Sequence, residues 1–283
     1  MKTQKLYIYK ADILPLTFIF LLFTCQCIVY FKVDSIALLL LSSLLFMPLL
    51  TFCVSYNHHH AHVPVSNSKI LNSVINRVLC LQVWISHYAW ILHHNIGHHA
   101  NYMNQHPDHH GDIDDSNWTR EDGTQMGRME YTIYLVKTAG HRVTENGKKS
   151  VQTYKRYLSF KLQNYVLLIL LLLYKPVAAS LIFIIPSLVM VVYTFWLTYP
   201  HHSGLRTEDP YKASRSITHP LYNFWFCNLG YHAAHHIKPG MHWSALPDFH
   251  KSIEDKIPDH LIQRTLFPEP RQILKTEDLE YDL

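Results

Sequence analysis

The chain has 283 residues, 48% of them hydrophobic, and a mean hydropathy of −0.02. It is too polar to lie wholly in a membrane, yet its apolar runs are too long for an ordinary soluble domain, so we expect a membrane part and a polar cap. The formal net charge is only +4, and the basic residues are scattered rather than lined up with aromatic residues, which argues against a nucleic-acid partner.

The first part of the chain predicts a helical hairpin. Residues 13–31 and 36–54 are each 19 residues without a formal charge, and at 1.5 Å per residue such a helix is about 28 Å long, enough to cross a hydrocarbon core. Lysines precede the first run, as in a signal peptide, but the run is long and has no small-x-small cleavage site. We therefore expect it to be a retained helix.

Residues 70–92 follow, and their first part has apolar residues at helical spacing with polar residues between them. This pattern predicts an amphipathic helix in the membrane interface rather than a fifth span. A span here would put the histidines before and after it on opposite faces of the membrane. If the segment lies flat, all the histidine clusters share one face, and this is the arrangement we expect. The apolar positions are Ile70, Leu71, Val74, Ile75, Val78 and Leu79.

A second hairpin is predicted around Lys175-Pro176, with spans over residues 155–174 and 177–199. Lys161 would then lie inside a span and extend its side chain toward the headgroups. Both turns on the far side are short, whereas basic residues accumulate on the histidine side, so the positive-inside rule makes that side and both termini cytoplasmic. We expect an all-α fold: one domain over residues 1–283, four transmembrane helices in two hairpins, interfacial helices, and a cytoplasmic helical cap over 94–153 and 200–283.

Twenty-two histidines are more than packing requires, and many fall in three clusters near the predicted membrane boundaries. Their i, i+3 and i, i+4 spacing places each cluster on one helix face, so together they could hold a pair of metal ions with an open position for oxygen. Imidazole suits iron, copper, nickel and zinc alike. A lone histidine is more often a surface or hydrogen-bonded residue, and we interpret His87 and His93 in that way. The clusters are His58 and His62; His94, His98 and His99; and His232, His235 and His236.

The order HxxxH, HxxxHH and HxxHH over four spans resembles the membrane fatty acid desaturase and hydroxylase superfamily, from about residue 35 to 250. The segments HNIGHH at 94–99 and TYPHHSGL at 198–205 are similar to motifs of its alkane hydroxylases. The second of these motifs adds His202, in preference to His201, as a ninth ligand. The resemblance implies a site with two iron ions that uses O2 to attack unactivated C–H bonds of a lipid chain. Its implied ligands are His58, His62, His94, His98, His99, His202, His232, His235 and His236.

Acidic residues follow the second cluster and His202, and a carboxylate there could orient a ligating imidazole through its free N–H. For any one of them a solvated acidic loop is an equally good interpretation. The candidates are Asp108, Asp112, Asp114, Asp115, Glu208 and Asp209. The substrate, a fatty acyl, lipid or alkyl chain, would enter between the helices or from their cytoplasmic end, past aromatic residues that could instead anchor the interface. These are Trp84, Trp90, Tyr193, Phe195 and Trp196.

The chain has no flavin, nicotinamide or iron–sulfur signature, and its five cysteines, without a CxxC pattern, are expected to be reduced and buried. Electrons would therefore come from a separate protein of the ferredoxin, rubredoxin or cytochrome b5 type. A basic region could dock that carrier or bind anionic lipid. It comprises Lys137, Arg142, Lys148, Lys149, Lys155 and Arg156.

Within the superfamily we favour a fatty acid desaturase, the larger group, because Lys238-Pro239 and Leu246-Pro247 after the third cluster fit it. An alkane or fatty acid hydroxylase, or an oxidative decarboxylase that forms terminal alkenes, is the close alternative, supported by HNIGHH and HHSGL. A metal-binding or metal-transporting membrane protein is disfavoured because its ligands would lie near the bilayer midplane.

Overall fold

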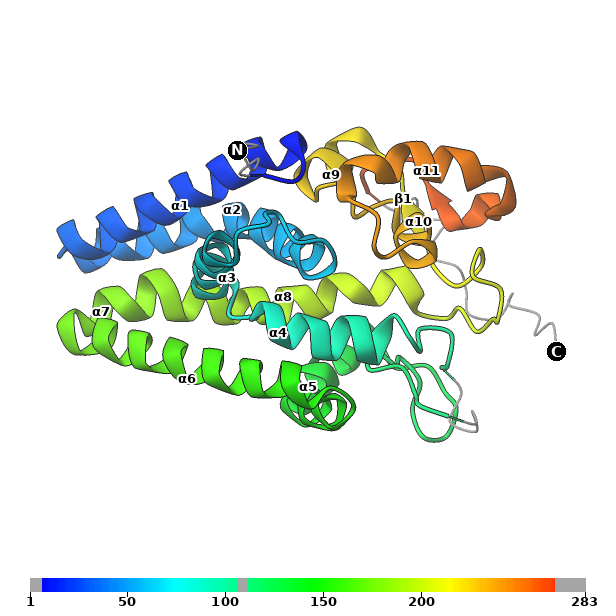
Figure 1. Ribbon diagram of the computed structural model, residues 1–283, viewed down its shortest axis with the longest axis horizontal. Helices are drawn as coiled ribbons and strands as arrows, with labels where there is room; N and C mark the ends of the chain where they lie inside the picture. The colour runs from blue at the N-terminus through cyan, green and yellow to red at the C-terminus, as the bar shows by residue number, and fades with distance from the viewer. Residues whose placement is uncertain (1–6, 106–110, 268–283) are drawn as a thin grey trace, which may run out of the picture.

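The computed structural model describes residues 7–105 and 111–267. Two long helical hairpins lie side by side (Figure 1). The first joins α1 (Ile13–Lys32), preceded by a 3-10 turn (Lys10–Asp12), to α2 (Ile36–His62). The second joins α6 (Val151–Tyr174) to a chain of α7 (Pro176–Ala179), a π-helical segment (Ser180–Ile184) and α8 (Ile185–His202). All four are long and apolar enough to cross a membrane, which confirms the four predicted spans.

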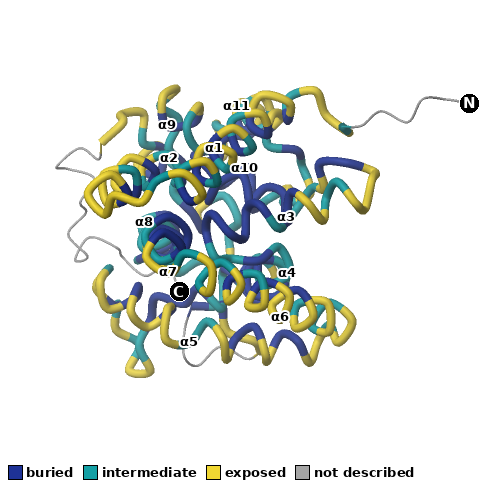
Figure 2. Tube along the Cα trace, turned by 90° about the vertical axis from the view of Figure 1, so that its left-hand side faces the viewer, coloured by how far each residue is buried: buried dark blue, intermediate teal, exposed yellow. Residues whose placement is uncertain are grey.

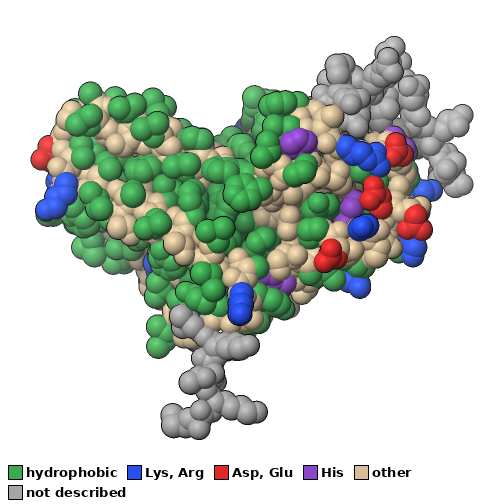
Figure 3. All heavy atoms as spheres, turned by 90° about the horizontal axis from the view of Figure 1, so that it is seen from above, with side chains coloured by type: hydrophobic (Ala, Val, Ile, Leu, Met, Phe, Trp, Pro, Cys, Tyr) green, Lys and Arg blue, Asp and Glu red, His purple; other side chains and the backbone are tan. Residues whose placement is uncertain are grey.

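The outer faces of the hairpins are apolar and exposed, whereas their facing sides are buried (Figure 2). Leu14 on α1 and Leu173 on α6 are 70% and 77% exposed, as expected of side chains that face lipid. Charged side chains gather at the cap, and a few mark the opposite tip (Figure 3). Of the cysteines, those at 53, 80 and 227 are buried as expected, but Cys25 on α1 is exposed.

The two short turns at the tip opposite the cap meet each other. Lys175 Nζ lies 2.6 Å from Asp34 Oδ1 and donates to Phe31 O at 3.1 Å. Nearby, Tyr30 Oη donates to Leu171 O at 2.7 Å. Both hairpins therefore end at the same level, as is required of two hairpins whose turns lie on the same side of a membrane.

Helix α3 (Lys69–Val83) runs across the long axis of the hairpins (Figures 1 and 2) and buries Ile75, Leu79 and Val83 completely. The structure divides the helix expected over residues 70–92, because Trp84 has a left-handed backbone conformation with φ of 56° that ends α3. Ser86 then caps α4 (His87–Trp90) by accepting from the Ala89 N–H at 3.1 Å. The chain can therefore turn from a transverse direction toward the cap.

The cap consists of short helices and α5 (Arg128–Lys149), which packs against α8. Its last part contains α9 (Pro220–Trp225), α10 (His232–Ile237), α11 (Leu246–Ile253) and 3-10 turns at Trp243–Ala245, Glu254–Lys256 and Asp259–Leu261. Two two-residue strands, β1 (Ser216–Ile217) and β2 (Ile262–Gln263), pair in parallel. The described chain is thus an all-α fold whose only strands close one loop of the cap.

A buried carboxylate joins the N-terminal segment to the cap. Asp12, only 2% exposed, accepts from Tyr56 Oη at 3.0 Å and from Trp243 Nε1 at 2.9 Å. His242 Nε2 lies 3.1 Å from its other oxygen, and the His242 ring stacks on Tyr9 at 3.8 Å between centroids. The start of α1, the end of α2 and the segment after α10 are therefore held together at the end of the bundle that carries the histidines.

Candidate metal centre

The helices deliver the histidines by continuing beyond the apolar runs. Helix α2 extends past residue 54 to His62, and α8 ends at His202. Two groups of imidazoles form there, and in each group the potential ligand atoms lie within 4.8 Å of one another. The five-histidine cluster contains His58, His62, His94, His99 and His235, and the other group contains His98, His202 and His236.

His232 lies beside the smaller group. Its Nε2 atom is 2.9 Å from His202 Nε2 and 3.2 Å from His236 Nε2, so we define these four residues as the four-histidine cluster. The structure thus brings together all nine histidines that the sequence had singled out. His201 lies outside both clusters: its ring stacks on His232 at 4.1 Å, and its Nδ1 lies 3.2 Å from Arg215 O.

The middle histidine motif divides between the two clusters because it lies on a π-helix, Ile91–His98. The His99 N–H donates to His94 O at 2.8 Å, so the residues that share a face are five apart rather than four. His94 and His99 therefore belong to the five-histidine cluster and His98 to the other. An α-helical i, i+4 interpretation of the motif would have paired His94 with His98.

Gly97 allows this π-helix to approach the loop behind it. A Cβ atom at Gly97 would overlap the Asp115 carboxylate and lie 2.6 Å from Asn146 Nδ2. Asp115 Oδ2 also accepts from Asn146 Nδ2 at 2.6 Å and lies 3.2 Å from His93 Nδ1. Any side chain at residue 97 must therefore displace the carboxylate that holds both groups.

We expect Gly97→Ala to lower the free energy of unfolding by about 1–3 kcal/mol, the usual cost of overfilling a packed site. Gly140→Ala on α5 is the matched control, because no other described part of the chain lies within 4 Å of its Cβ position and a helical Gly→Ala change stabilises by roughly 0.5–1 kcal/mol. Thermal unfolding of the purified variants in detergent measures both. Equal midpoints for the two variants would contradict the close approach at Gly97.

One buried carboxylate orients a clustered imidazole directly. Asp114 Oδ1 lies 2.8 Å from His98 Nδ1 and accepts from the Ser116 N–H at 2.8 Å, while Gln105 Nε2 donates to Oδ2 at 2.6 Å. Burial alone would raise the pKa of Asp114, but His98 and the Ser116 N–H hold that pKa below its ordinary value. An ionised Asp114 keeps the His98 proton on Nδ1 and leaves the Nε2 lone pair facing the cluster.

We expect Asp114→Ala to weaken metal binding about 10–100-fold, as is typical when the partner of a ligating histidine is removed. Asp112→Ala is the control, because Asp112 forms an exposed ion pair with Lys149 at 2.7 Å. The metal dissociation constant, measured by competition with a chelator, gives the comparison. If Asp112→Ala weakened binding as much as Asp114→Ala, the role of the His98 contact would be refuted.

The other acidic candidates have different roles. Asp115 pairs with His93, which is buried, and Asp209 accepts from the Tyr211 N–H at 2.9 Å. Glu208 is exposed, and Asp108 lies outside the described residues. His202 is oriented by a backbone group instead, since its Nδ1 lies 2.9 Å from Ala213 O.

Burial keeps five of the clustered imidazoles neutral. It lowers the pKa of His94, His99, His232, His235 and His236 well below the ordinary value, and the neighbouring imidazoles lower it further. A neutral ring has a free nitrogen lone pair, which is the form that binds metal. Two buried sets of nitrogen donors fit transition metals such as iron or zinc and do not fit magnesium or calcium, which prefer oxygen.

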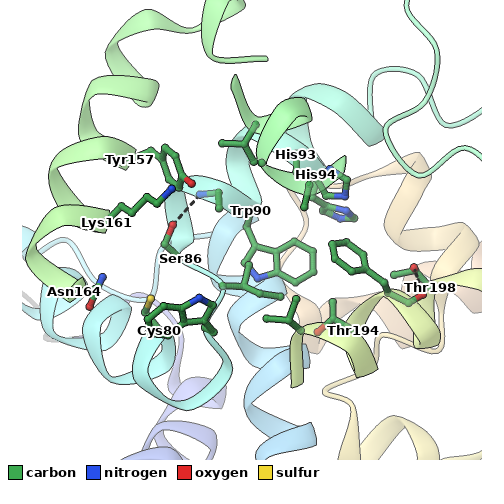
Figure 4. Close-up of a pocket in the computed structure, with 18 of the residues that line it drawn as sticks. Cys80, Ser86, Trp90, His93, His94, Tyr157, Lys161, Asn164, Thr194 and Thr198 are labelled. Carbon is green, nitrogen blue, oxygen red and sulfur yellow. Dashed lines mark hydrogen bonds between the residues drawn. The ribbon is translucent and has the colours of Figure 1, made fainter. Parts of the chain in front are cut away.

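A largely apolar cavity of about 240 Å³ lies against the five-histidine cluster (Figure 4). His94 and His93 line one part of it, together with Trp90 and Phe195, and Trp84 lines another. Of the aromatic residues considered for a substrate path, Tyr193 and Trp196 do not line it, and Trp196 packs under the Arg128 guanidinium at 4.2 Å. The position of His93 in this wall was missed from the sequence, where only its place beside His94 could have indicated it.

The profile of a protein family described as fatty acid desaturase matches residues 34–268, which is most of the chain. The chain belongs to the fatty acid desaturase family. No curated protein and no solved structure matches it. The matched region includes both histidine clusters, so membership confirms the resemblance predicted from the histidine motifs.

Family membership and geometry together define this desaturase-family protein as a multi-pass membrane oxidoreductase of the desaturase or hydroxylase type. Its two histidine clusters are consistent with a di-iron site. The family implies a lipid substrate, and the apolar cavity beside the five-histidine cluster has the character that such a substrate requires.

The basic region of this desaturase-family protein is smaller than its sequence suggests. Lys148 and Lys149 form ion pairs with Glu145 and Asp112, both at 2.7 Å. Arg142 is buried, with its guanidinium 4.8 Å from the Tyr134 ring centre. Three exposed cations remain from the predicted patch: Lys137, Lys155 and Arg156.

Proposed function

We propose that this protein is a fatty acid desaturase in which each histidine cluster holds one iron ion. The observation that carries the proposal is the pair of largely buried imidazole clusters at one end of an apolar cavity, in a chain of the desaturase family. The proposed ligands are the nine residues His58, His62, His94, His98, His99, His202, His232, His235 and His236.

Iron bound there would activate O2, so that a CH2–CH2 unit, O2, two electrons and two protons give CH=CH and two water molecules. Asp114 and the Ala213 carbonyl hold the proton of His98 and His202 on Nδ1, which directs Nε2 of each ring into the cluster. Trp90 and Phe195 form an apolar wall that excludes water and positions the chain.

The electrons would come from a separate carrier of the ferredoxin, rubredoxin or cytochrome b5 type. The exposed cations Lys137, Lys155 and Arg156 are the remaining candidates for its docking site. The Asp12 contacts to His242 and Trp243 support the placement of the N-terminal segment and the cap on one side of the membrane. The basic residues of that side support the cytoplasm as its location, with both termini there.

A hydroxylase or an oxidative decarboxylase is the second candidate, favoured by the HHSGL segment whose second histidine, His202, belongs to the four-histidine cluster. A desaturase removes a second hydrogen from the neighbouring carbon, whereas a hydroxylase transfers oxygen to the first carbon. Substrate position decides between these outcomes. A metal-transport role is disfavoured because the clusters lie at the ends of the spans rather than midway along them.

Gas chromatography and mass spectrometry of lipids and hydrocarbons from cells that express the protein test the proposal. We expect a new double bond in fatty acyl chains that is lost in His235→Ala and kept in the control His141→Ala, whose histidine is exposed on α5. A hydroxylated acid or a terminal alkene would support the second candidate instead. Metal uptake into vesicles without consumption of O2 would refute both.

A further inference from the structure

The cavity has two chemically different ends (Figure 4). His94, a member of the five-histidine cluster, lies on one side, and Lys161 of α6 lies on the opposite side, with the Trp90 indole between them. The lining is mostly apolar, and none of the described residues in it carries a carboxylate. Among the described residues that line it, Lys161 is the only lysine or arginine, so this lining places one positive charge opposite the candidate metal centre.

Lys161 has no carboxylate partner among residues 7–105 and 111–267. This differs from Lys148, Lys149 and Lys175, each of which forms an ion pair. Instead, the Lys161 ammonium lies between two aromatic rings, 5.6 Å from the centre of Tyr157 and 5.8 Å from that of Tyr165. These contacts position the cation without neutralising it.

A second polar group lies one turn further along α6. Asn164 lines the cavity and is only 4% exposed, and its Oδ1 has no hydrogen-bond partner in the described chain, while its Nδ2 donates to Phe160 O at 3.0 Å. Residues three apart on a helix are neighbours, so Asn164 Oδ1 can accept one of the three Lys161 ammonium hydrogens. The other two then remain for a ligand.

We propose that this cavity binds a single-chain, unesterified fatty acid, with its carboxylate at Lys161 and its chain directed past Trp90 toward the five-histidine cluster. The single cation matches one carboxylate, whereas a head group with several phosphates would leave negative charges unpaired against an apolar wall. Lys161 also lies in the half of α6 nearer the cap, so its long side chain can extend toward the headgroup level, where a fatty acid in a membrane places its carboxylate. As an assignment of substrate class, the proposal rests on the proposed function.

This orientation affects which reaction can occur. With the carboxylate held at Lys161, the carbons nearest to it lie away from His94 and the carbons presented to the cluster lie further along the chain (Figure 4). A decarboxylase must instead bring the carbons next to the carboxyl group to the metals. The distance between Lys161 and the metal site therefore determines how far from the carboxyl carbon the chain is attacked, and decarboxylation is disfavoured.

Binding can be measured without turnover by using bromine as a fluorescence quencher. The probes are 9,10-dibromostearic acid and its methyl ester, added to the purified full-length protein in detergent, and the signal is quenching of tryptophan fluorescence, since Trp84 and Trp90 line the cavity. We expect the wild type to bind the acid about tenfold more tightly than the ester, the ratio that one charge-assisted contact supplies. Lys161→Gln should reduce that ratio to about one, while Lys161→Arg should keep most of it.

Lys155→Gln is the matched control, because Lys155 is an exposed lysine of the same helix that does not line the cavity, and it should keep the wild-type ratio. Unchanged thermal midpoints would show that the variants are folded. Two results would overturn the proposal: equal binding of acid and ester by the wild type, or an unchanged ratio of acid to ester affinity in Lys161→Gln. Either result would show that the Lys161 side chain only extends toward the lipid headgroups and does not bind the carboxylate. Stronger displacement of the probe by phosphatidylglycerol than by stearic acid would overturn the choice of a free carboxylate.

The outcome is separable from that of the proposed function, because quenching needs neither O2 nor an electron donor. If the acid binds through Lys161 and no oxidised product forms in cells supplied with a carrier, the binding proposal stands and the desaturase proposal fails. If a double bond forms but the ester binds as well as the acid, the desaturase proposal stands and the free-acid assignment fails.

Discussion

Replacing His202 with alanine is expected to remove the metal ion of the four-histidine cluster, whereas His201→Ala should keep metal content near that of the wild type. His202 Nε2 lies 2.9 Å from His232 Nε2 and 3.1 Å from His236 Nε2, so its loss opens the cluster. His201 belongs to neither cluster, and its ring stacks on that of His232. Activity of His202→Ala should fall more than about 100-fold, beyond the 10–100-fold typical for a residue that only supports a ligand.

Metal content measured by mass spectrometry, together with product formation, checks this expectation. The two variants differ by one position on the same helix, so general damage to α8 would affect both. Full metal content in His202→Ala, or equal loss in the two variants, would contradict the assignment of His202 to the cluster. Detection of iron rather than zinc in the wild-type protein would identify the metal, which imidazole donors alone do not select.

Replacing Asp12 with alanine is expected to cause the largest loss of stability outside the clusters, about 3–5 kcal/mol, because it removes a buried carboxylate and leaves its three hydrogen-bond partners unpaired. Tyr56 Oη, Trp243 Nε1 and His242 Nε2 all lie within 3.2 Å of its carboxylate oxygens. The start of α1 would lose its attachment to the cap. The midpoint of thermal unfolding in detergent measures the effect.

The control is Asp34→Ala at the opposite tip of the hairpins. Asp34 also forms an ion pair, at 2.6 Å from Lys175, but its side chain is 86% exposed, so the expected loss is only about 0–1 kcal/mol. Asp12→Asn should fall between the two, since an amide oxygen can still accept one of the hydrogen bonds. If Asp12→Ala and Asp34→Ala lowered stability equally, the buried network would not be what holds the cap to the bundle.

The spans could be predicted from the sequence because a run of 19 uncharged residues has few alternatives to a membrane helix. The convergence of the nine histidines could also be predicted, since each motif has the spacing of metal ligands and all of them fall on the same side of the predicted spans. Both conclusions depend on local spacing and on the position of each motif relative to a membrane boundary.

Other features depend on contacts between distant residues. The π-helix brings Gly97 against Asp115 and Asn146, and the left-handed conformation of Trp84 ends α3 where the chain turns away from its transverse direction. Neither leaves a periodic signal in the sequence, and the pattern of residues 70–92 alone predicted one continuous helix. In the sequence, Asp12 and Lys161 likewise cannot be distinguished from ordinary charges near a membrane boundary. Their special roles depend on the contact of Asp12 with His242 and on the position of Lys161 in the cavity wall, which only the structure gives.

The π-helix has a further consequence for how the two clusters relate. This one short segment and the residue after it supply His94 and His99 to one cluster and His98 to the other, and α10 divides in the same way, with His235 in one cluster and His232 and His236 in the other. Neither segment can move without disturbing both sets of ligands. The two clusters are therefore mechanically coupled, because a displacement of either segment changes the geometry of both sets of ligands.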